Sequence, residues 1–199
     1  MNMNKHEFEL LLEELDEALV QAFPDPHPMK ALMVGGACLV FTDVISRSTQ
    51  DIHIIIFDLM GTDEDSLIFK TPVAVKIRKL IQGIGKRHGL KREERMFVND
   101  DCAPFLLELG RNQLPNMRLF RAYRKIHLYV PADMRYLLAC KLMAGRADKD
   151  FSDIAALCQV LDVQTRAQAQ TVVDRFFSSL LDQFAHHLPT TLNEIFGRD

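Results

Sequence analysis

Apolar residues recur at two different spacings along the chain, and the spacing changes at Pro131. Up to that residue, stretches of helical period alternate with short apolar or alternating runs that are typical of strands. Beyond it, every apolar stretch has the helical period. The pattern predicts helices over 4–23 and 73–89, strand-like segments within 31–40, 51–60 and 119–130, and further helices over 134–144, 154–161 and 169–181. It therefore predicts an α/β part at 1–130 and a helical part at 131–199.

The composition adds few constraints beyond this pattern. The chain has 199 residues, 48% of them hydrophobic, and a formal net charge of -3, which is typical of a globular protein. Its apolar runs are far shorter than the 18 or more residues that span a bilayer, so no membrane segment is expected. The N-terminus is acidic and amphipathic, unlike a signal peptide. These features predict a cytoplasmic protein.

The small net charge conceals two strongly basic stretches. Residues 70–95 and 111–149 each contain nine Lys or Arg and two acidic residues, whereas the rest of the chain is strongly acidic. Clustered cations are what a polyanion such as RNA or tRNA would contact. The alternative is that these cations only form the solvated faces of two amphipathic segments.

Candidate chemistry is concentrated between residues 34 and 56. Gly35 and Gly36 follow an apolar run, and a glycine pair lets the backbone approach a phosphate closely. Asp51 and His53 lie two residues apart at the start of the next strand, so their side chains share one face. The spacing places two metal-ligand types next to a phosphate-binding turn.

Two segments of the sequence resemble one known family. The first is Val34-Gly35-Gly36-Ala37 followed by Arg47-Ser48-Thr49 and Asp51-Ile52, and the second runs from 131 to 157 with Lys141, Arg146, Asp148, Asp150 and Asp153. Together they resemble the nucleotidyltransferase-fold proteins, specifically the bacterial branch of AbiEii-type toxins and their relatives. The resemblance implies an α+β fold, with a mixed sheet flanked by helices and a helical part at the C-terminus.

The resemblance also implies an activity, a cofactor and partners. Such proteins transfer a nucleoside monophosphate from a nucleoside triphosphate to an acceptor hydroxyl on RNA, tRNA or protein, with divalent cations at the site, and an antitoxin-like partner accompanies some of them. The implied nucleotide-binding residues are Gly35, Gly36, Arg47, Thr49, Lys141 and Arg146, the implied metal ligand is Asp51, and Asp148, Asp150 and Asp153 would form a supporting polar cluster. Lys141 would contact phosphate as a point charge. For the charges at 146–150, surface pairing and helix capping are an alternative explanation.

The sequence departs from the family pattern at the metal ligands. His53 stands where a second carboxylate is expected, and an imidazole suits Mn²⁺ or Zn²⁺ better than Mg²⁺. If the strand at 125–130 neighbours that of Asp51, His127 would complete an Asp-His-His metal site. Alternatively, the histidines fill a decayed pocket, or an acid of the Asn99–Asp101 turn supplies the missing carboxylate. The sequence thus leaves three hypotheses: a transferase with altered metal dependence, an inactive nucleotide- or RNA-binding module, or an interaction or dimerisation protein whose basic residues are only solvated.

Overall fold

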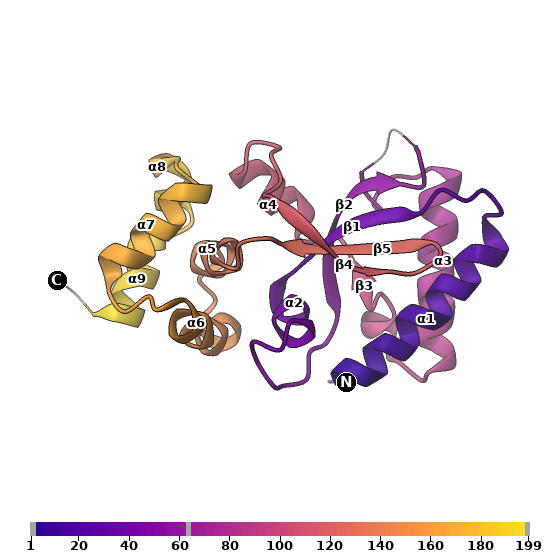
Figure 1. Cartoon of the computed structure of the whole chain (residues 1–199), viewed down its shortest axis with the longest axis horizontal. Helices are drawn as coiled ribbons and strands as arrows, with labels where there is room; N and C mark the ends of the chain where they lie inside the picture. The colour runs from indigo at the N-terminus through magenta and orange to yellow at the C-terminus, as the bar shows by residue number, and fades with distance from the viewer. Residues whose placement is uncertain (1–2, 63–64, 198–199) are drawn as a thin grey trace. The chain divides into compact units, whose positions relative to one another are not determined.

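The computed structural model describes residues 3–62 and 65–197 (Figure 1). Its contacts divide the chain into two compact units. The first unit comprises residues 1–41, 46–103 and 117–130, and the second comprises 42–45, 104–116 and 131–199. The chain passes into the second unit for the last time after Val130.

In the described residues, the first unit contains the sheet, three α-helices and one 3-10 helix, and the second unit is helical. In chain order the elements up to Pro131 are α1 (Lys5–Ala22), β1 (Met29–Val34), α2 (Gly35–Phe41), β2 (Ile52–Leu59), α3 (Pro72–Arg87), the 3-10 helix η1 (Arg92–Glu94), β3 (Val98–Asn99), α4 (Ala103–Leu109), β4 (Met117–Ala122) and β5 (Ile126–Pro131). They are followed by α5 (Arg135–Ala144), α6 (Ala147–Leu161), α7 (Arg166–Phe176), α8 (Leu180–Ala185) and α9 (Leu188–Phe196). The predicted α+β fold class is confirmed.

The five-stranded sheet is mixed and has the order β3-β2-β1-β5-β4. β1 pairs antiparallel with β2 and parallel with β5, while β2 pairs parallel with β3. The central strands read as nearly continuous apolar runs because both of their faces are covered, and Ile52, Ile54, Ile55 and Ile56 of β2 are all buried. This order places the start of β2 between the end of β1 and β3.

α1 forms where the sequence predicts it and anchors one end of the sheet. Phe8, Leu11, Leu15 and Leu19 lie on its buried stripe. Asp16 shares that face, and its carboxylate accepts hydrogen bonds from the backbone N–H groups of residues 124, 125 and 126 in the β4–β5 turn. A buried carboxylate with three such donors is satisfied, so Asp16 ties α1 to the β4–β5 turn.

α3 is the predicted basic amphipathic helix. It begins behind an N-cap at Thr71 with a proline in its first turn, and it buries Ala74, Ile77, Ile81 and Ile84. α1 and α3 lie side by side in Figure 1, and Glu14 of α1 bonds to Arg87 and His88 at the end of α3. Some cations of α3 therefore form bonds within the first unit, and others face solvent.

In the second unit α5 is the buried helix against which α6, α7 and α9 pack. Eight consecutive residues, 136–143, are all buried. Tyr136 makes edge-on and tilted ring contacts with Phe176 and Phe177 of the α7 region. The predicted capping box between Thr165 and Gln168 opens α7.

The helical boundaries of the second unit differ from the sequence-based expectation at two places. α6 begins at Ala147 rather than 154, because its first turn is polar and carries no apolar period. α7 ends at Phe176, and the apolar residues of 180–185 form the separate helix α8.

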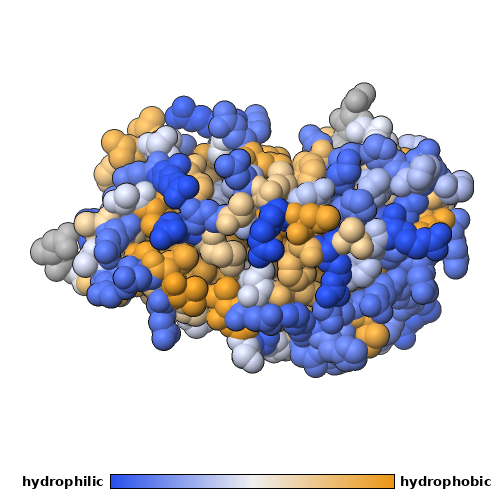
Figure 2. Space-filling model, in the orientation of Figure 1, coloured by the Kyte–Doolittle hydropathy of each residue, from blue (hydrophilic) through white to orange (hydrophobic). Residues whose placement is uncertain are grey.

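Apolar surface is distributed unevenly over the molecule. In the orientation of Figure 2, hydrophilic residues dominate the surface over α1, whereas hydrophobic residues gather over α5 and α6. Val160 of α6 and Leu181 and Phe184 of α8 are among the exposed apolar side chains. In the described residues, no helix is sufficiently long and apolar to cross a membrane.

Candidate functional site

The glycine pair lies in the turn that leads from β1 into α2. Gly35 has a positive φ of 69°, a conformation that disfavours residues with a side chain. A Cβ at Gly36 would lie 2.7 Å from Nη2 of Arg47, so any side chain there would displace the guanidinium. The turn therefore requires glycine for its conformation at Gly35, whereas at Gly36 the missing side chain leaves room for the guanidinium of Arg47.

Arg47 and Thr49 come from the segment that leads into β2. The guanidinium of Arg47 donates to the carbonyl of Ser48 at 2.8 Å, which helps hold it over the glycine turn. Thr49 is buried, and its backbone pairs with that of Met3. A cation and a hydroxyl thus face the glycine turn, and both are groups that bind phosphate oxygens.

Asp51, His53 and Asn99 form a closed set of polar contacts on the other side of the turn. Nδ2 of Asn99 donates to Oδ2 of Asp51 at 2.9 Å, and Oδ1 of Asn99 lies 2.9 Å from Nδ1 of His53. Nε2 of His53 lies 3.4 Å from Oδ1 of Asp51. A Cβ at Gly35 would meet the His53 ring at 3.4 Å, which places this set directly beside the glycine turn.

These contacts determine how the imidazole of His53 is used. The oxygen of Asn99 can only accept, so Nδ1 of His53 carries a hydrogen and donates it. Nε2 can then donate to Asp51 only when the ring is protonated. The Asp51 and His53 side chains are 33% and 32% exposed, so solvent or a ligand can reach them.

We call this group of seven residues the glycine-turn site: Gly35, Gly36, Arg47, Thr49, Asp51, His53 and Asn99. Six of them are site residues that the sequence predicts, and the structure brings these six together in the first unit. For Asn99 the sequence predicts only a turn, with a neighbouring acid as the alternative ligand. Because β3 has just two residues, it shows no alternation that periodicity could detect.

His127 does not join the glycine-turn site, and the predicted Asp-His-His arrangement is wrong. The strand that carries His127, β5, pairs with β1 and not with β2. His127 lies opposite Lys30, whereas His53 lies opposite Val34 at the other end of β1. Four residues of strand correspond to about 13 Å along its axis, well beyond metal-ligand distances.

The acids that follow Asn99 do not supply a carboxylate to the site either. Asp100 is buried, and its carboxylate accepts from the hydroxyl of Ser66 at 2.5 Å and from the backbone N–H of Leu67 at 2.7 Å. It therefore holds the loop before α3. Asp101 is exposed, and its backbone N–H donates to Oδ1 of Asn99.

Four of the remaining predicted site residues form a separate cluster in the second unit. Nζ of Lys141 lies 2.6 Å from Oδ1 of Asp150 and 2.9 Å from Oδ2 of Asp153, and Nε of Arg146 lies 2.8 Å from Oδ2 of Asp150. The side chain of Lys141 is 9% exposed and those of the two acids no more than 1%. We call these four residues the buried ion cluster.

The buried ion cluster is explained by internal pairing. Burial by itself would raise the pKa of Asp150, but hydrogen bonds and charge from Arg146 and Lys141 outweigh it and lower the pKa. The carboxylate is thus ionised and matched by cations of its own unit. Asp148, the fifth predicted member, is exposed in the first turn of α6 and is not part of the cluster.

The side chains of the glycine-turn site do not fit the divalent cations that the family resemblance implies. One carboxylate is present, one of its oxygens accepts from Asn99, and the amide and imidazole are bonded to each other. In residues 3–62 and 65–197, no three His, Cys, Asp or Glu side chains are grouped as a metal site requires. The polar groups instead suit a ligand that carries its own negative charge to Arg47.

Comparisons of the chain with protein-family models, curated proteins and solved structures find no match. The fold and the glycine-turn site therefore carry the functional argument by themselves.

Proposed function

We propose that the protein binds a nucleotide through its phosphates at the glycine-turn site and acts as a non-catalytic nucleotide-binding module. The observation that carries this proposal is the guanidinium of Arg47 directly over the side-chain-free backbone of Gly36. Arginine binds phosphate with two parallel hydrogen bonds, and the missing side chain of Gly36 lets the guanidinium lie directly against the turn. The hydroxyl oxygen of Thr49 lies 3.6 Å from the position that a Cβ at Gly36 would take.

The neighbouring polar set supports binding rather than metal-assisted transfer. In a two-metal mechanism several oxygen ligands hold the cations that stabilise the attacking and leaving oxygens. Here His53 and Asn99 occupy the two positions beside Asp51 and are bonded to each other. A nucleotide would then be held by the cation, the hydroxyl and the turn itself.

A second candidate, nucleotidyl transfer, is favoured by one observation. Asp51 lies 3.4 Å from Nε2 of His53, and both side chains are accessible. A carboxylate in contact with an imidazole can accept the proton of an acceptor hydroxyl. This candidate requires turnover that depends on Asp51.

Calorimetric titration with each nucleoside triphosphate, in EDTA and then with Mg²⁺ or Mn²⁺, tests the proposal. We expect binding in EDTA, a loss of about tenfold or more in Arg47→Gln because one charge-assisted contact disappears, and no loss in Asp51→Asn. Arg118→Gln, an exposed arginine of β4, is the matched control and should leave the affinity unchanged.

The same proteins incubated with labelled nucleoside triphosphate and RNA separate the two candidates. Binding that strictly requires a divalent cation and disappears in Asp51→Asn would contradict the metal-free mode. Labelled product formed by the natural protein but not by Asp51→Asn would establish transfer instead. Intact triphosphate together with binding in EDTA would support the binding module.

A further inference from the structure

A basic cleft lies in the first unit between α3 and the segment that follows it. The cavity has a volume of about 440 Å³ and is lined by Lys79, Gln82, Gly83, Lys86, Arg92 and Arg95. Four of these six residues carry a positive charge, and none of these lining residues is acidic. None of the site residues discussed above belongs to it.

The spacing of the lining residues on α3 explains why they face one way. Residues 79, 82, 83 and 86 follow the i, i+3, i+4, i+7 series and therefore share one face of the helix. Lys79 and Lys86 lie two turns apart, or about 10 Å along the helix axis. Their charges form a row, which suits a chain of phosphates better than a single one.

The opposite wall of the basic cleft is held in place by a close backbone contact. A Cβ at Gly85 would lie 2.9 Å from the Cα and carbonyl oxygen of Arg95, so glycine lets the segment 90–95 lie directly on α3. The N–H of Leu90 donates to the carbonyl of Gly85, and Nε of Arg95 donates back to the carbonyl of Leu90. Two arginines are thereby positioned across from the lysines.

The cations of α3 that face elsewhere are used by the fold. Arg87 pairs with Glu14, Arg78 donates to the carbonyl of Leu67, and Lys76 donates to the carbonyl of Ala22. In contrast, Lys79, Lys86 and Arg92 are exposed. In the part of the chain that the structure describes, no carboxylate pairs with them, so their charge is available to a ligand.

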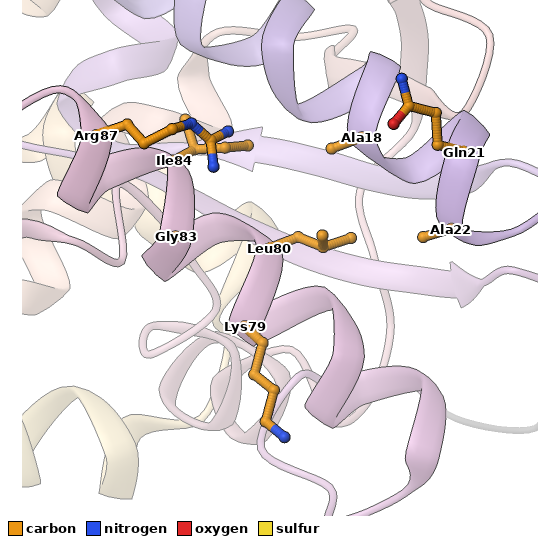
Figure 3. A pocket seen from close by; sticks show the side chains of 8 residues that line it. All are labelled: Ala18, Gln21, Ala22, Lys79, Leu80, Gly83, Ile84 and Arg87. Atoms are coloured by element: carbon orange, nitrogen blue, oxygen red, sulfur yellow. The ribbon is translucent and has the colours of Figure 1, made fainter.

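A second groove, between α1 and α3, meets the basic cleft at Lys79 and Gly83 and differs from it in character. Figure 3 shows Leu80 and Ile84 directed toward Ala18 and Ala22 of α1, while Lys79 extends away from α1. The α1 side of α3 is thus mainly an apolar packing face, and the charged side is the basic cleft.

We propose that the basic cleft binds the phosphodiester backbone of a single nucleic acid strand. A row of lysines and arginines with one glutamine and a glycine contacts phosphates without reading bases, so binding is independent of sequence. Because the lining has no aromatic side chain on which a base could stack, the strand is held through its phosphates and not through its bases. This proposal does not depend on nucleotide binding at the glycine-turn site.

Fluorescence anisotropy with a labelled 20-nucleotide RNA of mixed sequence, and with the matching DNA strand, measures this binding between 50 and 200 mM salt. The test variant is K79Q/K86Q/R92Q, and the control variant is K70Q/R118Q/R124Q, which removes three exposed cations of the same unit outside the cleft. We expect at least a tenfold loss of affinity in the test variant and less than a twofold loss in the control. Each phosphate contact on a single strand contributes about 0.7 to the steepness of log K against log salt. Because the test variant removes three cations, its plot should be less steep by about 2.

Circular dichroism and thermal unfolding check that both triple variants fold, and K79R/K86R should retain binding because it retains the charge. Arg47→Gln should bind the strand normally, which separates failure of the nucleotide proposal from failure of this one. Three results would overturn the proposal. The first is an equal loss of affinity in both triple variants, and the second is no binding at 50 mM salt. The third is displacement of the RNA by inorganic tripolyphosphate at equal phosphate concentration.

Discussion

Two polar clusters of this protein look alike in sequence and differ in structure. The glycine-turn site and the buried ion cluster each combine acids with basic or neutral polar residues, and the family resemblance implies a role at the nucleotide for members of both. In the first, Asp51 and His53 are each about one-third exposed. In the second, Asp150 and Asp153 are buried and face Lys141.

The difference shows that the bonding partners and the solvent exposure of charged side chains distinguish a binding site from a structural ion pair. An ionised group that is buried needs an internal counter-charge, because desolvation otherwise costs several kcal/mol. The buried ion cluster supplies that counter-charge within its own unit and leaves Lys141 occupied by two acids. The glycine-turn site leaves accessible polar groups beside an arginine.

Removing Lys141 should produce the largest effect. Lys141→Met would leave two buried carboxylates facing each other with one cation fewer, so we expect a loss of about 3–5 kcal/mol in the free energy of unfolding, measured with urea. Arg146→Gln is the comparison, since that side chain is 53% exposed and Asp150 keeps Lys141 as a partner, so the loss should be clearly smaller than in Lys141→Met. Similar small losses in both variants would break the contrast.

Asp58 tests whether a carboxylate is structural because of its bonding partners or because of the unit in which it lies. In the first unit Asp58 bonds to Lys30 at 2.8 Å, to His27 at 2.9 Å and to the backbone N–H of Gly61. Partial burial would raise the pKa of Asp58, but these bonds lower it to about 2. Asp58 is therefore a structural carboxylate at the end of β2 remote from the glycine turn.

Because the pKa of Asp58 is lower in the folded protein, its contribution is present above its unfolded pKa near 3.8 and is lost as the pH falls toward 2. In Asp58→Asn this part of the pH dependence should disappear, with a stability difference of about 1 kcal/mol or less at pH 7. Urea unfolding at several pH values between 5 and 2.5 measures it. An unchanged acid dependence in the variant would contradict the assigned role.

The smallest effect on stability is expected at the glycine-turn site. Asp51→Asn keeps the shape of the side chain, and the group is accessible, so the free energy of unfolding should change by no more than about 0.5 kcal/mol. A loss of 2 kcal/mol or more in thermal or urea unfolding would show that Asp51 is a structural residue, like the acids of the buried ion cluster.

Much of the fold follows from local patterns. The apolar stripe of α1, the basic helix α3 and the capping box of α7 all lie where the sequence predicts them. Each depends on contacts or caps within a few residues along the chain, and such contacts are readable from periodicity and capping residues. The grouping of Arg47, Thr49, Asp51 and His53 around the glycines is likewise local, because one turn and one short connection join them.

The amino-acid sequence alone thus determined the α+β composition, the main helices and six of the seven residues of the glycine-turn site. Only the tertiary structure decided the strand order. This order brings Asn99 next to His53 and places His127 away from the glycine-turn site. It also decided that Lys141 is matched by internal acids and that four cations of 79–95 line one cleft. Strand neighbours and burial depend on contacts between distant parts of the chain, and no local spacing encodes them.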